Sequence, residues 1–147
     1  MATVHLVRIA YASTTPRLLA RPEVDVLLSS WRRVNARLGV TGLVLHDRMS
    51  VFSVLEGFPD VVPALFATVA RDPRHHLVAM LIDEPIAERD FGDWSMGHAR
   101  VSVRDLAIAP ALRALRDPAF HYGRCDEGIA RAVIAAFAEG PWRRSIG

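Results

Sequence analysis

Lysine is absent from this sequence of 147 residues, so all 18 of its strongly basic side chains are arginines. These arginines are spread along the chain and mostly stand beside acidic residues, as in Arg71-Asp72, and the formal net charge is only +2. A protein that binds nucleic acid needs a dense basic stripe or a recognisable reading motif. The sequence has neither, and we therefore expect no nucleic-acid partner.

Cysteine occurs once, at Cys125. A single thiol can form no internal disulfide, and it excludes a metal site built from four thiolates. The adjacent His75 and His76 would point in different directions and make a poor metal pair, and no metalloprotease motif is present. We therefore expect no metal site and a reducing, cytoplasmic compartment.

Long apolar runs are also missing, although 51% of the residues are hydrophobic. No stretch approaches the roughly 18 residues that a membrane span needs. The first five residues, MATVH, do not form the basic segment and apolar block of a secretion signal. With a length that suits one hydrophobic core, the chain is predicted to be a soluble cytoplasmic protein with no membrane contact.

The apolar pattern predicts an α+β fold. Alternation of apolar and polar positions indicates strands, whereas Leu27, Trp31, Val34 and Leu38 recur at helical spacing until Gly39. The predicted elements are a strand at 5–11, a helix at 22–38, strands at 41–46 and 51–56, a helix at 62–69, and strands at 77–82 and 94–103. This order is the ferredoxin-like βαββαββ arrangement, in which two helices cover one face of a mixed sheet.

The tail is predicted to contain two more helices, at 110–116 and 127–139. Asp126 is a candidate cap of the second, and Gly140-Pro141 would end it. No repeat, low-complexity tract or linker separates the tail from the rest of the chain. We therefore expect residues 1–104 to form one domain, and residues 105–147 to be a helical extension packed on it, covering the other face of the sheet.

The sequence contains five short motifs of interest: LVRIAYAS at 6–13, NARLGVTG at 35–42, VLEG at 54–57, RDPRH at 71–75 and FGDWSM at 91–96. In order and spacing they resemble the BLUF family, whose members are blue-light sensors that use FAD. Each motif alone is weak, but together they resemble essentially the whole family domain, over residues 5–103. The resemblance implies a photoreceptor rather than an enzyme, with a flavin ring between the two helices. The usual flavin is FAD, with FMN or riboflavin as alternatives.

The resemblance implies roles for two residues on the first strand and helix. Tyr11 matches the tyrosine that gives an electron and a proton to the photoexcited flavin; the alternative is a core tyrosine with its tip at the surface. Asn35 matches the asparagine that hydrogen-bonds the polar edge of the flavin, since an amide offers both a donor and an acceptor. Taken alone, an asparagine four residues before Gly39 is more often part of a helix end.

Four further residues match family positions later in the chain. Arg74, with His75 beside it, corresponds to an arginine near the phosphates or the ring edge of the cofactor, which suits a guanidinium; the alternative is an exposed turn residue. Trp94 and Met96 correspond to the tryptophan and methionine of the fifth strand that pass the signal on. Without the resemblance, both are ordinary sheet residues.

The chain departs from the family pattern at Ser53, where the family has a glutamine two residues before Leu-Glu-Gly. In the family mechanism this glutamine bridges the tyrosine hydroxyl and flavin N5, and its altered hydrogen bonding after electron transfer reddens the spectrum. Serine is shorter and has no amide, so a water would have to complete the bridge. Because Ser53 shares a strand face with Val51 and Leu55, it should point toward the pocket.

A second departure is Trp31, four residues before Asn35, where many relatives have a smaller polar residue. Its indole could crowd the flavin ring, stack beside it, or fill the core.

These observations leave two main hypotheses. The first is a flavin-binding, blue-light-sensor-like protein whose photocycle is altered or lost because of Ser53, and which signals through protein–protein contacts as a homo-oligomer. The alternative is a light-insensitive, cofactor-free interaction module on the same fold. An acylphosphatase-like hydrolase comes third, because nothing in the sequence assembles its phosphate loop and fold analogy is weak support.

Overall fold

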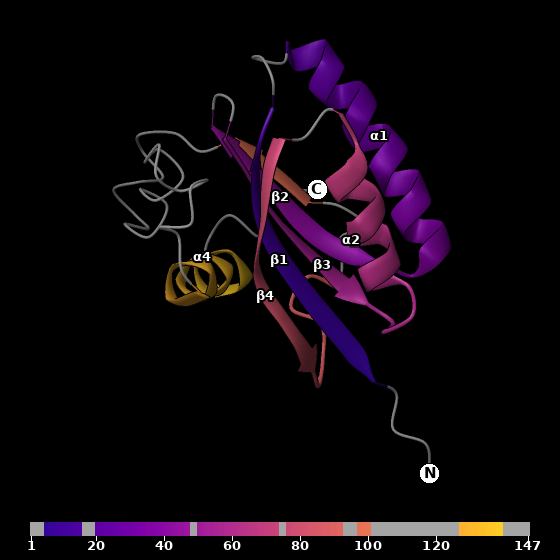
Figure 1. Cartoon of the computed structure of the whole chain (residues 1–147), viewed down its shortest axis with the longest axis vertical. Coiled ribbons are helices and arrows are strands. Elements are labelled where there is room, and N and C mark those ends of the chain that lie inside the picture. The colour runs from indigo at the N-terminus through magenta and orange to yellow at the C-terminus, as the bar shows by residue number, and fades with distance from the viewer. Residues whose placement is uncertain are drawn as a thin grey trace.

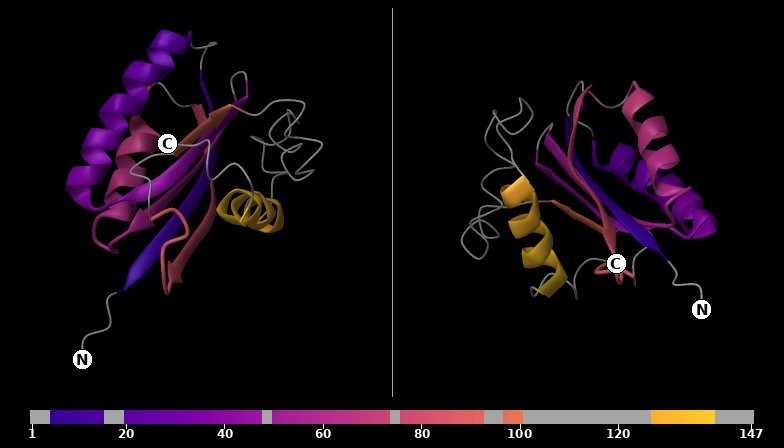
Figure 2. Two further views of the ribbon diagram at one scale, coloured as in Figure 1. Left: turned by 180° about the vertical axis from the view of Figure 1, so that it is seen from behind. Right: turned by 60° about the horizontal axis from the view of Figure 1, so that its bottom comes forward.

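The computed structural model describes residues 5–15, 20–47, 50–73, 76–92, 97–100 and 127–139. In this part of the chain, one sheet lies between helices α1 and α2 on one face and helix α4 on the other (Figure 1). The views in Figure 2 show the same three layers. The elements are β1 (Leu6–Thr14), α1 (Arg21–Leu38), β2 (Thr41–Asp47), β3 (Ser50–Gly57), α2 (Val62–Arg71), β4 (His76–Ile86), β5 (Gly97–Arg100) and α4 (Glu127–Glu139). The predicted ferredoxin-like α+β order is confirmed.

The strands of the sheet are arranged in the order β4-β1-β3-β2-β5. β1 pairs antiparallel with β3 and β4, and β2 pairs antiparallel with β3 but parallel with β5, so the sheet is mixed, as predicted. Strand β4 continues beyond the predicted 77–82 to Ile86, because Glu84 and Pro85 still pair with β1. β4 is an edge strand, where a proline without an N–H group is tolerated.

Part of the predicted tail and of the fifth strand lies outside the described residues. β5 is described as Gly97–Arg100, inside the predicted strand at 94–103. The helix predicted at 110–116 also falls outside the described ranges. The helix predicted at 127–139 is present with those bounds as α4.

Helix α1 begins and ends where its sequence provides the necessary groups. The Glu23 carboxylate accepts a hydrogen bond from the Ala20 N–H at 3.2 Å. A proline occupies the first turn, where the missing N–H costs no hydrogen bond within the helix. At the other end, Gly39 adopts a left-handed conformation with φ of 71° and donates its N–H to the Asn35 carbonyl. The predicted helix end at Gly39 is confirmed, and this turn fixes the last turn of α1.

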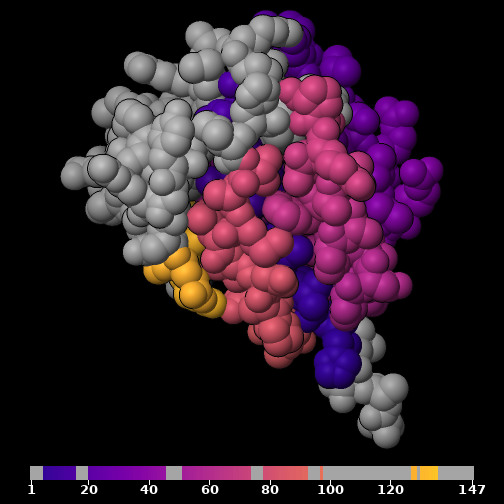
Figure 3. All heavy atoms as spheres, viewed as in Figure 1, coloured from indigo at the N-terminus to yellow at the C-terminus, as the bar shows by residue number. Residues whose placement is uncertain are grey.

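Both faces of the sheet are buried. The core under α1 and α2 combines side chains that alternate along the strands with residues of the helices and their ends. Its buried members are Ile9, Tyr11, Leu28, Val40, Val44, Val51, Leu55 and Val62. The opposite face carries residues of the other parity, such as Phe52 and Val54, which are 0% exposed. α4 lies on this second face, as predicted, and contacts β4 (Figure 3). Among the described helices, none is long and apolar enough to cross a membrane.

Gly42 in β2 provides the first prediction, because a Cβ atom there would lie 2.0 Å from the carbonyl oxygen of Val54 in β3. Gly42→Ala must push β2 away from β3, so we expect it to lower the free energy of unfolding by about 2 kcal/mol or more. The matched control is Gly92→Ala, since the nearest atom to its new methyl is 3.6 Å away. Urea unfolding of both variants measures the difference, and equal stability would contradict the close approach of the two strands.

Candidate functional site

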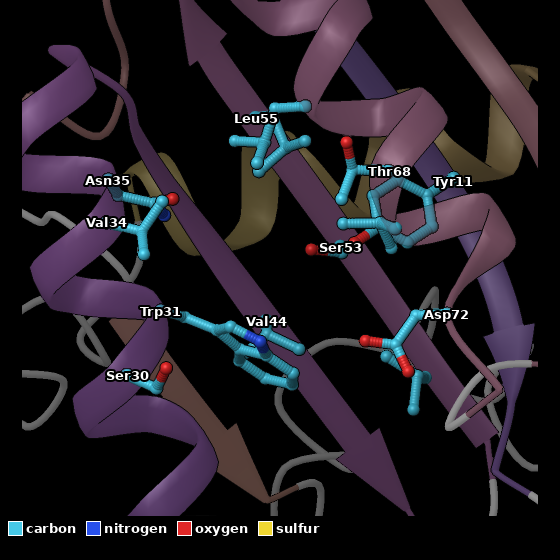
Figure 4. A pocket seen from close by; sticks show the side chains of 13 residues that line it. Tyr11, Ser30, Trp31, Val34, Asn35, Val44, Ser53, Leu55, Thr68 and Asp72 are labelled. Atoms are coloured by element: carbon cyan, nitrogen blue, oxygen red, sulfur yellow. The ribbon is translucent and has the colours of Figure 1, made fainter.

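A cavity of about 210 Å³ lies between the sheet and helices α1 and α2 (Figure 4). Most of its wall is apolar and comes from both the sheet and the helices: Val44, Val51, Leu55, Val34, Leu65 and Val69. A few polar groups also line it, among them Tyr11, Asn35 and Ser53. An apolar cleft with a few convergent polar groups is the usual form of a site for a small organic molecule.

The register of the sheet brings two of these polar groups together. In the β1–β3 pair Tyr11 lies directly opposite Ser53, and in the β2–β3 pair Ser53 lies opposite Val44. The three side chains therefore share one row on the face beneath the helices. Ser53 lines the cavity, which agrees with the predicted direction of its side chain, and it is only 1% exposed. Its hydroxyl donates a hydrogen bond to the Leu43 carbonyl oxygen at 3.3 Å.

Tyr11 is buried in the core under α2. Its ring lies 5.3 Å from the ring of Phe66, centroid to centroid, in a tilted arrangement. Burial raises the pKa of the Tyr11 hydroxyl to about 12, because the phenolate would be desolvated, and a hydrogen bond with the Ser53 side chain partly offsets this rise. The Tyr11 and Ser53 hydroxyls therefore lie together in the buried wall of the cavity, where the Ser53 hydroxyl also bonds to the β2 backbone.

Asn35 serves two purposes at the end of α1. Its backbone carbonyl accepts the N–H groups of Gly39 and, at 2.9 Å, of Val40, which closes the helix. Asn35 as a whole is 3% exposed, and its side chain lines the cavity. The two sequence interpretations of Asn35, as a helix end and as a ligand-binding residue, are therefore compatible, because different atoms of the residue serve each one.

Trp31 lies one turn before Asn35 on the same side of α1. It is half-buried, packs against the core, and lines the cavity. Figure 4 shows its indole projecting from α1 into the cavity. The indole therefore both packs against the core and forms part of the cavity wall, and the three alternatives for this residue stay open.

The structure thus gathers Tyr11, Trp31, Asn35 and Ser53 around one cavity. The remaining sequence candidates, Arg74, His75, Trp94 and Met96, lie outside the described residues. Their roles stay predictions. Where the structure does describe the chain, no group of three or more metal-ligating side chains could hold an ion.

Sequence reasoning missed a charged cluster formed by Arg8, Glu56, Arg89 and Asp90, in which Arg8 and Glu56 are buried. Glu56 is 0% exposed and binds the Arg8 guanidinium at 2.9 Å, and Arg8 also pairs with Asp90. A signal was available, because a charged residue inside a strand of apolar residues is almost never fully buried unless it is paired. The partner on the loop after β4 could not be read from such a pattern, since loop residues show no periodicity.

Known proteins are similar to this chain over the segment that contains the cavity residues. The model of the family described as "BLUF: Sensors of blue-light using FAD" matches residues 6–97. A photoactivated adenylate cyclase subunit beta of Euglena longa is 30% identical over 81 residues, which cover 55% of this chain and 9% of that protein. The blue light- and temperature-regulated antirepressor BluF of Escherichia coli is 28% identical over 74 residues, covering 50% and 18%. The chain therefore spans only a small part of these curated relatives.

Among solved structures, the dark-state structure of BlrB, a BLUF protein, is similar over nearly its whole length. The TM-score is 0.66 and the sequence identity 32%, and the match covers 92% of this chain and 99% of BlrB.

The raised pKa of Tyr11 predicts a loss of stability in alkaline solution. The unfolded chain releases the phenol proton near pH 10, whereas the folded chain keeps it until about pH 12, so the folded state binds more protons between these values. The free energy of unfolding therefore falls as the pH rises through this window. By pH 11 the wild type should lose on the order of 1 kcal/mol more than Tyr11→Phe, relative to pH 9. Urea unfolding at both pH values measures this difference, and equal losses would show that Tyr11 is not buried as described.

Proposed function

The chain belongs to the BLUF family, a family of sensors and not of enzymes, and we propose that it binds FAD in the cavity between α1 and α2 but responds to light in an altered way or not at all. Two observations support the proposal together. The family match extends over residues 6–97, and the cavity lies beneath the two helices with Tyr11, Asn35 and Ser53 in its wall.

The residues around the cavity fit a flavin ring. When bound, the flavin absorbs blue light and accepts an electron. The valines and leucines of the wall suit the flat faces of the ring. The carboxamide of Asn35 suits its polar edge, because it carries both a donor and an acceptor. The cavity volume of about 210 Å³ is below the range of roughly 300–1,000 Å³ usual for small-molecule sites, so only the ring system would be enclosed. We assign Arg74 and His75 to the phosphates or the ring edge.

The altered light response follows from side chains that the sequence does not contain. Glutamine occurs at no position, and Asn35 is the only carboxamide side chain in the whole chain. The partner of the Tyr11 hydroxyl is instead the Ser53 hydroxyl, which is tied to the Leu43 carbonyl. A hydroxyl has no amide that can rotate to present a donor in place of an acceptor. The amide that changes its hydrogen bonds in the family mechanism is therefore absent at this position.

Signalling would pass through protein contacts. The Euglena relative is a photoactivated cyclase subunit, and the Escherichia coli relative is an antirepressor. In both, the segment similar to this chain is only a small part of the protein. We propose that this chain acts on a partner protein in the cytoplasm as a homo-oligomer. The segment with Trp94 and Met96 and the helical extension 105–147 are the parts we assign to this contact.

The absorption spectrum tests flavin binding directly. The purified protein, or the chain refolded with FAD, should absorb blue light as a bound flavin does. Denaturation should release that flavin. A chain that stays colourless after reconstitution with FAD would refute the proposal.

A matched pair of variants tests the role of Ser53. Under blue light the wild type should show no reversible red-shifted form, whereas Ser53→Gln should gain one, because the glutamine restores an amide between Tyr11 and the ring. Ser53→Ala is the control, since it removes the hydroxyl without adding an amide, and it should behave like the wild type. A normal red shift in the wild type would show that the family response does not require the glutamine.

The position of Trp31 supports a second candidate, a cofactor-free interaction module, because the indole projects into the cavity that the ring would occupy. Trp31→Ser separates the two functions. If the indole takes the place of a ligand, the variant should bind FAD and the wild type should not. If the indole stacks on the ring, the variant should bind FAD about tenfold more weakly than the wild type, since one aromatic contact is lost. Fluorescence titration with FAD measures both affinities.

A further inference from the structure

The carboxylate of Glu56 is fully buried and accepts hydrogen bonds from four donors. Oε2 binds the Arg8 guanidinium and the backbone N–H of Asp90, both at 2.9 Å. Oε1 binds the backbone N–H of Phe91 at 3.0 Å and the Thr41 hydroxyl at 3.2 Å. A buried carboxylate is tolerated only when it is paired and hydrogen-bonded in this way.

These donors come from separate parts of the chain, so Glu56 joins segments that are distant in sequence. Arg8 lies in β1, Thr41 begins β2, and Asp90 and Phe91 belong to the loop after β4. Phe91 is itself 0% exposed. Glu56 therefore fixes this loop against the end of β3.

Arg89, the residue before Asp90, reaches from the fixed loop to the end of α1. Its guanidinium donates to the Gly39 carbonyl at 2.8 Å, the Thr41 hydroxyl at 2.8 Å and the Glu56 backbone carbonyl at 3.1 Å. A cation at a helix C-terminus also interacts favourably with the helix dipole. Arg89 thus closes the turn that ends α1.

That turn determines where Asn35 lies. Gly39, whose carbonyl Arg89 holds, also donates its own N–H to the Asn35 carbonyl, and Val40 donates to the same atom. The Asn35 side chain lines the cavity from this last helical turn. A shift of Gly39 would therefore move Asn35 relative to the cavity.

We propose that Arg89 and Glu56 form a clasp that positions the Asn35 carboxamide in the cavity: Glu56 holds the loop, and Arg89 on that loop holds the end of α1. Arg89 is a positioning residue, since it acts through Asn35. The effect on the ligand rests on the proposed flavin site, but the effect on Asn35 does not.

The sequence offers an unusually clean probe of this clasp. Because Asn35 is the only asparagine and glutamine is absent, the side-chain amide region of a ¹H–¹⁵N spectrum contains one NH₂ pair. In the ligand-free protein, Arg89→Met should shift this pair, because the Gly39 carbonyl loses its hydrogen bond from Arg89. The control Arg131→Met removes an arginine of α4 that is paired with Glu84 of β4 and Glu127 of α4, and it should leave the Asn35 signal in place.

The same variants test the consequence for the ligand. In a fluorescence titration with FAD, Arg89→Met should raise Kd about tenfold, whereas Arg131→Met should stay within about twofold of the wild type. Arg89→Lys keeps the charge but not the planar fork, so it should give an intermediate Kd and carries the comparison if the methionine variant does not fold.

An unmoved Asn35 pair in both Arg89 variants would overturn the proposal, as would equal shifts from Arg89→Met and Arg131→Met. A wild type that binds no FAD would refute the proposed function instead, and the ligand-free spectra would still decide whether the clasp positions Asn35.

Discussion

Antiparallel pairing of β1 with β3 sets Tyr11 directly opposite Ser53, and the cavity depends on that register. A slip of β3 by one residue would turn the Ser53 hydroxyl away from Tyr11 to the far face of the sheet, where Phe52 and Val54 are packed. The same pairing places Arg8 opposite Glu56. Arg8 is three residues before Tyr11 on β1, and Glu56 is three residues after Ser53 on β3. One register therefore positions the polar pair in the cavity and the buried ion pair that holds the loop after β4.

The order of elements could be predicted because it rests on local patterns. Alternation marks β1, helical spacing marks α1, and Gly39 ends that helix as its left-handed conformation requires. The length of β4 could not be predicted, because Glu84 stays in the strand through its pairing with β1 and its contact with Arg131 of α4. Such long-range partners leave no trace in a local window.

In the candidate site, too, some features could be predicted from the sequence and others could not. A resemblance to the family located Tyr11, Asn35 and Ser53, and the strand period indicated the direction in which Ser53 points. Neither could reveal the contact of the Ser53 hydroxyl with the Leu43 carbonyl or the reach of Arg89 to Gly39, because both join atoms that only the folded chain brings together. The position of the Trp31 indole likewise depends on how α1 packs on the sheet.

On the proposed function, this chain would separate two properties that the family combines. The apolar wall and the Asn35 carboxamide, which would hold a flavin, do not depend on the residue at position 53. The hydrogen-bond switch does depend on it, and a serine tied to the β2 backbone is a poor substitute for an amide. Such a protein would keep a bound flavin ring in contact with Tyr11. It would lack an amide side chain whose hydrogen bonds could change after the ring is excited.

The central claim is that the ring lies in the cavity between α1 and α2. The most direct measurement is a titration of the ¹⁵N-labelled chain with FAD, following the single carboxamide pair of Asn35 and the indole N–H of Trp31. The account predicts that both signals shift together and saturate as FAD fills one site. Signals that stay in place while FAD binds, or that show no response at any FAD concentration, would contradict it.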